Sequence, residues 1–439
     1  MISRKKRMRI LFISEYSLQQ NSSGCLHYKD ILQSVGINNE TNHLHISNQI
    51  RCSNLFEDIK KTDYCALGSL NPPIILHEHF QEIKSYRLNV ASYYDDKEIY
   101  SNETDRYLAL VINKYRFFLL AKHIKDSFIN YYDLFVVFLQ EPTAFFLAEG
   151  LICQDQKVIS LIMDPPEMRH GIYLNNHLSR DFINTSFKSC IRDSLGLIMP
   201  SEEAKNISRI DNINREIAVA YPVIRGTFYS DLQDDQAKFN NCSRTINIVL
   251  VGQIYALESL AAFLKGLVIL KSKINLDAVN FVYYGGLDGK NKLGKLKAES
   301  KYSAINIMIN EPLNHSRLIE EIKGKYDFGY VPFPFSEDMS DTVSYSFPSK
   351  FVSYVEAGIM PMYHGPQSTV YNFLKKYNLT ELSISSTNSN SIANNMSSII
   401  NEYNFKNKNE IISKLSDIFG KKKLASNMNN FINKIMSKL

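Results

Sequence analysis

Residues 346–361 carry the strongest chemical signal in this chain, because their spacing predicts a helix with a defined start and end. Ser346 can cap the first amides, and Pro348 suits the first turn, where its missing N–H is not needed. Gly358 suits a left-handed cap after the last turn. The sequence therefore predicts a helix whose N-terminus is fixed at one place.

The start of this predicted helix has the properties of an anion site. The N–H groups of residues 347–350 have no partner within the helix, and the helix dipole places positive potential beside them. Ser349 adds a hydroxyl group and Lys350 adds a positive charge. A nucleotide diphosphate is the anion that such a site suits. The alternative is an ordinary capped helix whose lysine points into water.

The first half of the chain offers candidates for proton transfer. Glu15 and Gly24 lie in a polar loop after a predicted strand, and His27 follows at the start of a predicted helix. An imidazole in that position can act as a base, although a satisfied surface histidine is the other interpretation. Glu141 and Asp164 each follow a later strand, so either carboxylate could serve as a base or bind an acceptor.

Two further features of the second half are weaker indications of a ligand site. Residues 285–289 (GGLDG) resemble a dinucleotide-binding loop but lack the G-x-G-x-x-G spacing, which favours a simple turn. His364 follows the helix of residues 346–361 and is a candidate for lining the same pocket.

Short apolar runs alternate with helical patterns along the chain, as in an α/β protein with parallel sheets. We predict strands at residues 8–14, 133–139, 157–163, 195–200 and 217–223, and then at 246–251, 279–284, 304–308 and 327–331. Two such series in succession predict two Rossmann-like, doubly wound domains that face a central cleft. Ligands bind such sheets beyond the carboxyl ends of the strands.

The loss of apolar periodicity after residue 224 predicts the boundary between these domains. We expect an N-terminal acceptor domain at 1–225, a linker at 226–245 and a C-terminal domain at 246–410. Residues 411–439 are expected to form a basic C-terminal helix that packs back toward the N-terminal domain.

The segment at residues 347–361, FPSKFVSYVEAGIMP, resembles the FPSK-x-x-x-Y-x-x-x-G-x-P element in the C-terminal domain of GT-B glycosyltransferases of the broad family-4-like group, with one more residue before the last proline. Residues 8–24 are similar to that family's first strand and glycine-bearing loop. Residues 251–252 are similar to the start of its second domain, and residues 327–332 to a later strand. The resemblance implies a GT-B fold and metal-independent transfer of a sugar from a nucleotide-sugar, with no further cofactor.

We expect the donor to be bound by residues of the second domain. Gly252, Pro348, Ser349, Lys350 and Tyr354 lie in the segments that resemble the family, and His315 and Arg317 are further polar candidates outside those segments. Glu15, Gly24 and Glu337 would lie in loops that face the cleft, and the acceptor would be a cell-surface glycan or a lipid-linked molecule. Catalysis would involve Glu141, Asp164 or His27.

The chain departs from the family at positions that matter for the donor. Gln253 and Glu258 stand where the family has Arg and Lys, and Tyr345 and Ser353 stand where it has a pair of glutamates. Two alternatives therefore remain open. One is a non-hydrolysing sugar-nucleotide epimerase, and the other is a catalytically inactive partner protein with the same fold.

The cysteine pattern and the length of the apolar runs indicate the cellular compartment in which the protein works. The six cysteines are scattered, with no C-x-x-C pair and no histidine at metal spacing, so we expect reduced thiols and no metal site. No apolar run reaches the roughly 18 residues that span a bilayer. These features predict a cytoplasmic protein.

Charge is unevenly distributed. The net charge is +5, yet the first nine residues carry five positive charges, and residues 406–439 carry eight lysines against two acidic residues. Basic ends on an acidic body fit attachment to an anionic membrane surface, and two solvated termini are the alternative. The body shows no basic stripe with interleaved aromatic residues, so nucleic acid is not an expected partner.

Overall fold

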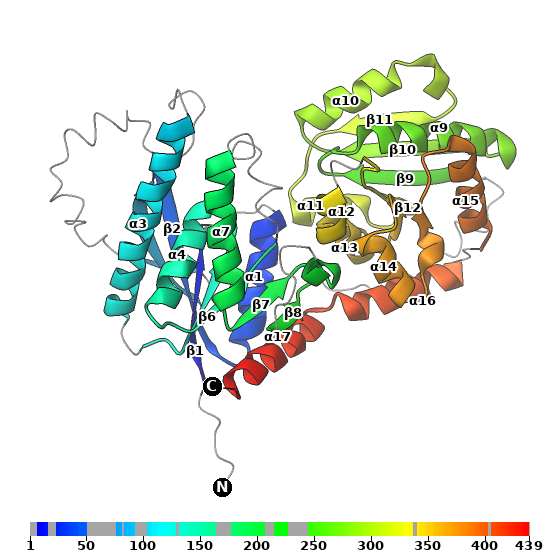
Figure 1. Cartoon of the computed structure of the whole chain (residues 1–439). Coiled ribbons are helices and arrows are strands. Elements are labelled where there is room, and N and C mark those ends of the chain that lie inside the picture. Colours follow the sequence, from blue (N-terminus) through cyan, green and yellow to red (C-terminus); the bar gives the residue numbers. More distant parts are fainter. Residues whose placement is uncertain are drawn as a thin grey trace, which may run out of the picture. The chain divides into compact units, whose positions relative to one another are not determined.

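A computed structural model of the chain describes residues 7–15, 23–50, 76–80, 83–92, 103–128, 131–163, 177–206, 215–226, 245–336, 340–402 and 405–438. The chain divides into two compact units (Figure 1). The first is Met1–Ala220 with Leu424–Leu439, and the second is Tyr221–Lys423. Both units are α/β, as predicted.

The first unit is built on an eight-stranded sheet with the order β3-β4-β2-β1-β5-β6-β7-β8. Its strands are β1 (Arg9–Ser14), β2 (Glu40–Ile50), β3 (Leu76–Phe80), β4 (Ile83–Ser92), β5 (Leu134–Phe138), β6 (Val158–Leu161), β7 (Gly196–Met199) and β8 (Glu216–Val219). Neighbouring strands run parallel except β3, which is antiparallel to β4. From the β1–β5 junction the order runs outward through β2 and β4 on one side, with β3 beyond them at the edge, and through β6, β7 and β8 on the other side, as in a doubly wound sheet.

Strand β1 shows why the predicted strands form. Its apolar residues Ile10, Leu11, Phe12 and Ile13 are all buried, with exposed fractions of 0 or 1%. A run that is apolar at every position is stable only where both faces of a sheet are covered. Ile10 lies opposite Leu134 of β5 in parallel register. The predicted strands at residues 8–14 and 133–139 are thereby confirmed.

The helices of the first unit are α1 (Ser23–Gly36), α3 (Glu103–Ser127), α4 (Pro142–Cys153), α7 (His177–Asp193) and α17 (Lys421–Met436), with a 3₁₀ turn η2 (Glu203–Asn206). Helix α4 lies against α3 and α7 (Figure 1). Most of its residues are buried, including Phe145, Phe146 and Leu147, which are 0% exposed. Helix α4 is therefore buried, in contact with strands β5 and β6 and with helices α3 and α7.

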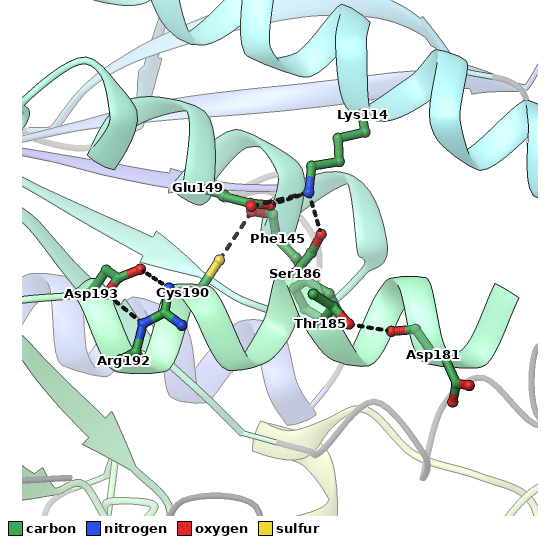
Figure 2. Close-up of polar contacts among 9 residues, drawn as sticks. All are labelled: Lys114, Phe145, Glu149, Asp181, Thr185, Ser186, Cys190, Arg192 and Asp193. Carbon is green, nitrogen blue, oxygen red and sulfur yellow. Dashed lines mark hydrogen bonds and ion pairs between the residues drawn. The ribbon is translucent and has the colours of Figure 1, made fainter. Parts of the chain in front are cut away.

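A polar cluster joins these three helices (Figure 2). The Nζ of Lys114 on α3 lies 2.8 Å from Glu149 Oε2 on α4 and donates to Ser186 Oγ on α7 at 3.0 Å. The thiol of Cys190 on α7 donates to the carbonyl oxygen of Phe145 at 3.1 Å, and burial raises the pKa of this thiol. Lys114 is thus turned toward the protein.

The range predicted as one C-terminal helix, residues 411–439, is divided by the structure. Helix α16 (Phe405–Ile418) ends before Gly420, and α17 begins at Lys421. Residues Leu424–Leu439 belong to the first unit. There the amide of Asn429 donates to Ser34 O at 3.1 Å and accepts from Asn39 Nδ2 at 3.1 Å. These buried hydrogen bonds make α17 an integral part of that unit.

The second unit contains a parallel six-stranded sheet with the order β11-β10-β9-β12-β13-β14. Its strands are β9 (Thr245–Val251), β10 (Ala278–Tyr284), β11 (Asn306–Asn310), β12 (Phe328–Pro332), β13 (Met360–His364) and β14 (Ser383–Ile384). Renumbered from its first strand, this is the 3-2-1-4-5-6 order of a dinucleotide-binding Rossmann sheet. The predicted fold class is confirmed.

The helices of this unit are α9 (Leu257–Lys273), α10 (Leu287–Lys297), α11 (His315–Ile322), α12 (Ser340–Tyr345), α13 (Ser349–Glu356), α14 (Thr369–Lys376), α15 (Ser389–Glu402) and α16, with short turns η4 (Ser300–Tyr302) and η6 (Thr380–Leu382). The unit begins at Tyr221, just upstream of the predicted linker at 226–245. Most of that linker, 227–244, lies outside the described residues.

Candidate functional site

The candidate site lies in the second unit, at the point where the order of the strands in the sheet reverses. Strands β9 and β12 are neighbours, and the connections from them lead to opposite sides of the sheet. Ligands of open parallel sheets bind beyond the carboxyl ends of the strands at such a switch point. Gly252 directly follows β9, so this predicted donor-binding residue lies at the expected place.

The turn at Gly252 is fixed by its backbone. Its φ of +79° is a left-handed conformation that glycine adopts without strain. Its N–H donates to Tyr284 O at 2.8 Å, and its carbonyl oxygen accepts from the hydroxyl of Tyr283 at 2.8 Å. No described atom lies within 4 Å of where a Cβ would stand. The turn therefore presents bare backbone to open space.

The glycines of residues 285–289 have a packing role. A Cβ at Gly285 would lie 2.0 Å from the hydroxyl oxygen of Tyr283, and one at Gly289 would lie 1.9 Å from it. The Tyr283 side chain thus passes between the turns after β9 and β10, where only glycine leaves room. The expectation of a simple turn holds, since Gly286 caps α10 and no dinucleotide loop is formed.

Helix α13 begins three residues after its predicted cap. Pro348, with φ −73° and ψ 125°, is the N-cap, and the helix starts at Ser349. The N-cap is therefore not Ser346, as predicted, because the residue before a proline disfavours helical conformation and the helix starts only after Pro348. Pro348 offers no side-chain hydrogen bond to the first turn. The backbone N–H groups in the first turn of α13 therefore receive no hydrogen bond from the side chain of the N-cap residue.

The end of α13 agrees with the prediction. Gly358 has φ +69°, its N–H donates to Val355 O at 3.0 Å, and the N–H of Ile359 donates to Tyr354 O at 2.8 Å. These two hydrogen bonds form a Schellman motif. The helix is thereby closed at its C-terminus by the glycine that the sequence indicated.

Aromatic packing fixes where α13 lies in the second unit. Its first residues join a cluster of rings whose centroids lie 4.9–6.0 Å apart, formed by Tyr221, Phe347, Phe351, Phe373 and Phe419. Contacts of this kind add to the stability that burial provides. The N-terminus of α13 is therefore attached to a rigid part of the core.

Lys350 reaches from α13 to the loop after Gly252. Its Nζ donates to Gln253 O at 3.2 Å and lies 5.0 Å from the centre of the Tyr255 ring. Burial lowers the pKa of Lys350 to about 8. The structure thus brings Lys350 and Gly252, two of the predicted donor-binding residues, to one place at the edge of the sheet.

Tyr354 has a different position from the one predicted. Its side chain is 0% exposed, and its hydroxyl accepts from Val251 N at 3.0 Å and donates to Tyr330 O at 3.2 Å. It therefore ties the end of β9 to β12. In this geometry Tyr354 holds the strand that precedes Gly252 and does not face a ligand.

His315 and Glu356 form a separate cluster. His315 Nε2 lies 3.2 Å from Glu356 Oε2, and Gly226 N donates to Oε1 of the same carboxylate at 2.7 Å. Burial alone would raise the pKa of Glu356, but His315 and the backbone N–H groups of Gly226 and Arg225 hold it below its usual value. This cluster fastens the first residues of the unit to α13.

The contacts of Lys350 and the His315–Glu356 cluster lie at different places on α13. Lys350 and Glu356 are six residues apart, which corresponds to about 9 Å along the helix and to directions about 120° apart around its axis. Arg317, the other predicted donor-binding cation, uses its backbone N–H to complete the Asn314 cap of α11 at 3.0 Å. Its side chain is exposed. The described contacts therefore do not bring His315 or Arg317 to Lys350.

His364 lies in the core instead of lining a pocket. It is 0% exposed, with Nδ1 2.7 Å from the hydroxyl of Tyr330 and Nε2 2.8 Å from Ser386 O. Burial lowers its pKa to about 4, so the ring is neutral at pH 7. Nε2–H then donates to Ser386, and Nδ1 accepts from Tyr330. This candidate has a structural role.

The first unit has its own switch point, between β1 and β5. Glu15 follows β1, while Glu141 follows β5 and is the N-cap of α4. The hydroxyl of Thr143, on the first turn of α4, donates to the Glu15 carboxylate. The structure thus brings the Glu15 carboxylate to the start of the helix that Glu141 caps, at the carboxyl edge of the sheet.

His27 and Gly24 lie in helix α1. The helix begins at Ser23, so Gly24 is in its first turn and not in the predicted loop. His27 is 5% exposed, and its Nε2 donates to Ala220 O at 2.9 Å. A base at His27 would have to use Nδ1. Asp164 and Glu337, the remaining predicted residues, lie outside the described residues.

Lys292 on α10 also reaches the loop after β9. Its Nζ donates to Ile254 O at 3.1 Å and lies 2.8 Å from Asp288 Oδ2. Sequence reasoning does not single it out, because α10 carries four lysines and only the fold decides which one meets the loop. The role of such a lysine can be recognised only from contacts between elements that are distant in sequence.

The part of the chain that the structure describes lacks two kinds of feature. It contains no group of three or more His, Cys, Asp and Glu side chains arranged to hold a metal ion. Within the same residues, no helix has the length and apolar character needed to cross a membrane.

Comparison by sequence found no match, either among protein-family models or among curated proteins. Comparison by structure found many similar folds. A sucrose-phosphate synthase from Thermosynechococcus elongatus matches with a TM-score of 0.62 and 12% identity, covering 99% of this chain and 100% of the other.

Two further structures match over nearly the full length. A trehalose-6-phosphate structure from E. coli bound with UDP-2-fluoro glucose has a TM-score of 0.60 and 11% identity, covering 97% of this chain and 98% of the other. An α,α-trehalose-phosphate synthase (UDP-forming) from Burkholderia xenovorans in complex with glucose-6-phosphate has a TM-score of 0.55 and 10% identity, covering 99% of both chains. The chain therefore has the two-domain GT-B fold.

Proposed function

We propose that this protein is a glycosyltransferase that moves a sugar from a nucleotide-sugar donor to an acceptor. The observation that carries the proposal is the Lys350 ammonium group, which bonds the loop beyond Gly252 at the switch point of a Rossmann-ordered sheet. A nucleotide beyond β9 would present its diphosphate to this cation and to the bare backbone of Gly252. The fold shared with the UDP-2-fluoro glucose complex supports the same assignment.

The chemistry of sugar transfer explains why a cation is useful there. The bond between the anomeric carbon and a diphosphate oxygen breaks, and negative charge develops on the departing diphosphate. An ammonium group held beside it stabilises that charge without a metal ion. Ser349 would add backbone and hydroxyl donors at the start of α13, with Pro348 as the cap that keeps them accessible.

We place the acceptor on the first unit, near the carboxyl ends of β1 and β5. Glu141, the N-cap of the helix whose Thr143 bonds Glu15, is the residue that we assign as a base if the configuration inverts, since such a base must take the proton of the acceptor hydroxyl. Asp164 and His27 are the other candidates. The anomeric configuration of the product, read by NMR, separates inversion from retention.

For the acceptor, we propose a cell-surface glycan or its lipid carrier, on the basis of the family-4-like element at residues 347–361. A sugar phosphate is the competing class, because the Burkholderia xenovorans neighbour is in complex with glucose-6-phosphate. Parallel transfer assays with both acceptor classes and one radiolabelled donor distinguish them.

A second candidate function is a non-catalytic partner that keeps the fold. It is favoured by Gln253, Glu258 and Ser353, which replace charged residues of the family-4-like pattern. An epimerase would differ from both, since it would convert the donor without any acceptor.

Calorimetry with UDP-, GDP-, CMP- and dTDP-sugars tests these possibilities. We expect saturable binding of one nucleotide class, followed by release of its nucleoside phosphate only when an acceptor is present. Binding without turnover would favour the partner protein, and an epimerised free nucleotide-sugar would favour the epimerase. Absence of binding to every member of the panel would overturn the proposed function.

We further propose that the protein works in the cytoplasm at the inner face of the membrane, where a lipid-linked acceptor would be found. The basic ends of the chain support this. Not all of that charge is available, because Lys434 and Lys438 lie 2.7 and 2.6 Å from Glu216 within the first unit. Lys422 and Lys423 are exposed and are the better candidates for contact with lipid.

Vesicle flotation tests the membrane proposal. We expect the protein to float with anionic vesicles and not with neutral ones, and the double variant Lys422→Gln, Lys423→Gln to float less. Truncation is a poor test, because Leu424–Leu439 belong to the first unit. Equal recovery with both vesicle types would contradict the proposal.

A further inference from the structure

We infer that Lys292 on α10 supplies the second positive charge that holds the diphosphate of the donor. This inference rests on the proposed function, and it concerns a residue outside the family-4-like pattern. It follows from three observations on the second unit: the charges that the loop after β9 lacks, the side chains that reach this loop, and the open space beside it.

The loop after β9 has no cation of its own. Gln253 and Glu258 occupy the positions where the family-4-like pattern has Arg and Lys, and Glu258 is an exposed acid on the first turn of α9. A nucleoside diphosphate carries at least two negative charges, and charge-assisted hydrogen bonds are the strong contacts to phosphate. Lys350 alone leaves this charge partly unbalanced.

Two lysines from other elements approach this loop. Lys350 donates to Gln253 O at 3.2 Å, and Lys292 donates to Ile254 O at 3.1 Å. Gln253 and Ile254 are consecutive, so ammonium groups from α13 and α10 both lie at one short segment. Neutral carbonyl oxygens are weaker partners for an ammonium group than phosphate oxygens. A bound diphosphate would therefore draw both lysines from the carbonyls.

The space beside this loop is bordered by bare backbone. Neither Gly252 nor Gly286 has a described atom within 4 Å of the position of an added Cβ. The Tyr283 hydroxyl, which donates to Gly252 O, holds these two turns together. The backbone of both turns is therefore open, on the side where a Cβ would stand, to the approach of a phosphate group.

Other lysines of α10 are less suited to this role. Lys290 is paired with Glu311, and Lys295 and Lys297 lie in the last turn with exposed side chains. The pair that Lys292 forms with Asp288 does not prevent movement, because the Asp288 side chain is 78% exposed and exposed pairs contribute little stability. Lys292 can therefore exchange partners at low cost.

Calorimetry tests this inference with four proteins: the wild type, Lys292→Met, Lys292→Arg and the control Lys295→Met. The ligands are UDP, GDP and dTDP, and the corresponding monophosphate of whichever binds most tightly. We expect Lys292→Met to weaken diphosphate binding by about tenfold or more and to weaken monophosphate binding less. Lys292→Arg should keep most of the affinity, and Lys295→Met should match the wild type.

The outcomes separate this inference from the proposed function. If the wild type binds no nucleotide, both fail. If the wild type binds and Lys292→Met binds equally well, only the inference fails. Equal weakening of diphosphate and monophosphate, together with a lower Tm, would also overturn it, because Lys292 would then be a tether for the loop.

Discussion

Replacing Lys350 with methionine is expected to weaken donor binding by about ten- to a hundredfold and to lower kcat/KM at least as much. The methionine side chain keeps the apolar stem that passes the Tyr255 ring but removes the ammonium group, which bonds Gln253 O at 3.2 Å. The variant should fold, since the side chain is only half-buried and forms no ion pair with another residue that the structure describes. Calorimetry and initial rates measure the two effects.

Lys375→Met is the matched control, because Lys375 is an exposed lysine at the end of α14 in the same unit. It should bind the donor as the wild type does. Wild-type affinity in Lys350→Met would move the donor site away from the start of α13 and would remove the main support for the proposed function.

The pH dependence of binding gives an independent check on Lys350. Burial lowers its pKa to about 8, so the free protein loses this charge as the pH rises through 8. Donor affinity should therefore fall between pH 7.5 and about 9, whereas Lys350→Arg should stay nearly constant because a guanidinium does not titrate there. A bound phosphate favours the charged form and shifts the fall to higher pH.

The same pKa sets the sign of the effect on folding. The unfolded lysine keeps its proton up to its ordinary pKa of about 10.4, so between pH 8 and that value the unfolded state binds more protons. The contribution of Lys350 to the free energy of unfolding should therefore rise with pH in this window. The exposed part of the side chain keeps this contribution small.

Replacing Gly329 with alanine is expected to lower the free energy of unfolding of the second unit by about 3 kcal/mol or more. Gly329 lies in β12, and an added Cβ would stand 2.2 Å from the Cγ and Cδ2 atoms of Tyr354. The ring cannot easily move, because its hydroxyl is bonded to Val251 N and Tyr330 O. Urea unfolding followed by circular dichroism measures the loss.

Two further variants show whether the collision with Tyr354 is the cause. In the double variant Gly329→Ala, Tyr354→Leu the ring is gone, so adding Gly329→Ala to Tyr354→Leu should cost far less than it does in the wild type. Gly294→Ala is the control glycine, since no described atom lies within 4 Å of its added Cβ in α10, and it should be neutral or slightly stabilising. An unchanged urea midpoint in Gly329→Ala would refute the packing argument.

Gly329→Ala should also affect the donor site. The Tyr354 hydroxyl holds Val251, the residue before Gly252, so displacement of the ring moves the turn that presents bare backbone to the ligand. We expect weaker donor binding even under conditions in which the variant is fully folded.

The sequence alone determined the class of fold, because the relevant signals are local. Residues 10–13 and 246–251 are apolar at nearly every position, and such runs must be buried on both faces wherever they lie. Gly358 was identified as a helix end for the same reason, since a left-handed cap is a property of one residue. Strands β2, β4, β13 and β14 were not predicted, because β2 and β4 are more polar, β13 contains a proline and β14 has only two residues.

Only the tertiary structure decided which side chains meet. Tyr354 lies within the motif at residues 347–361 and His364 lies just after it, yet contacts with Val251 and Ser386 place both side chains in the core. In the sequence, Lys292 is one of four similar lysines of α10, and only its hydrogen bond to the loop after β9 distinguishes it. Hydrogen-bond partners far apart in sequence depend on how the strands are ordered in the sheet, and the composition of one segment carries no information about that order.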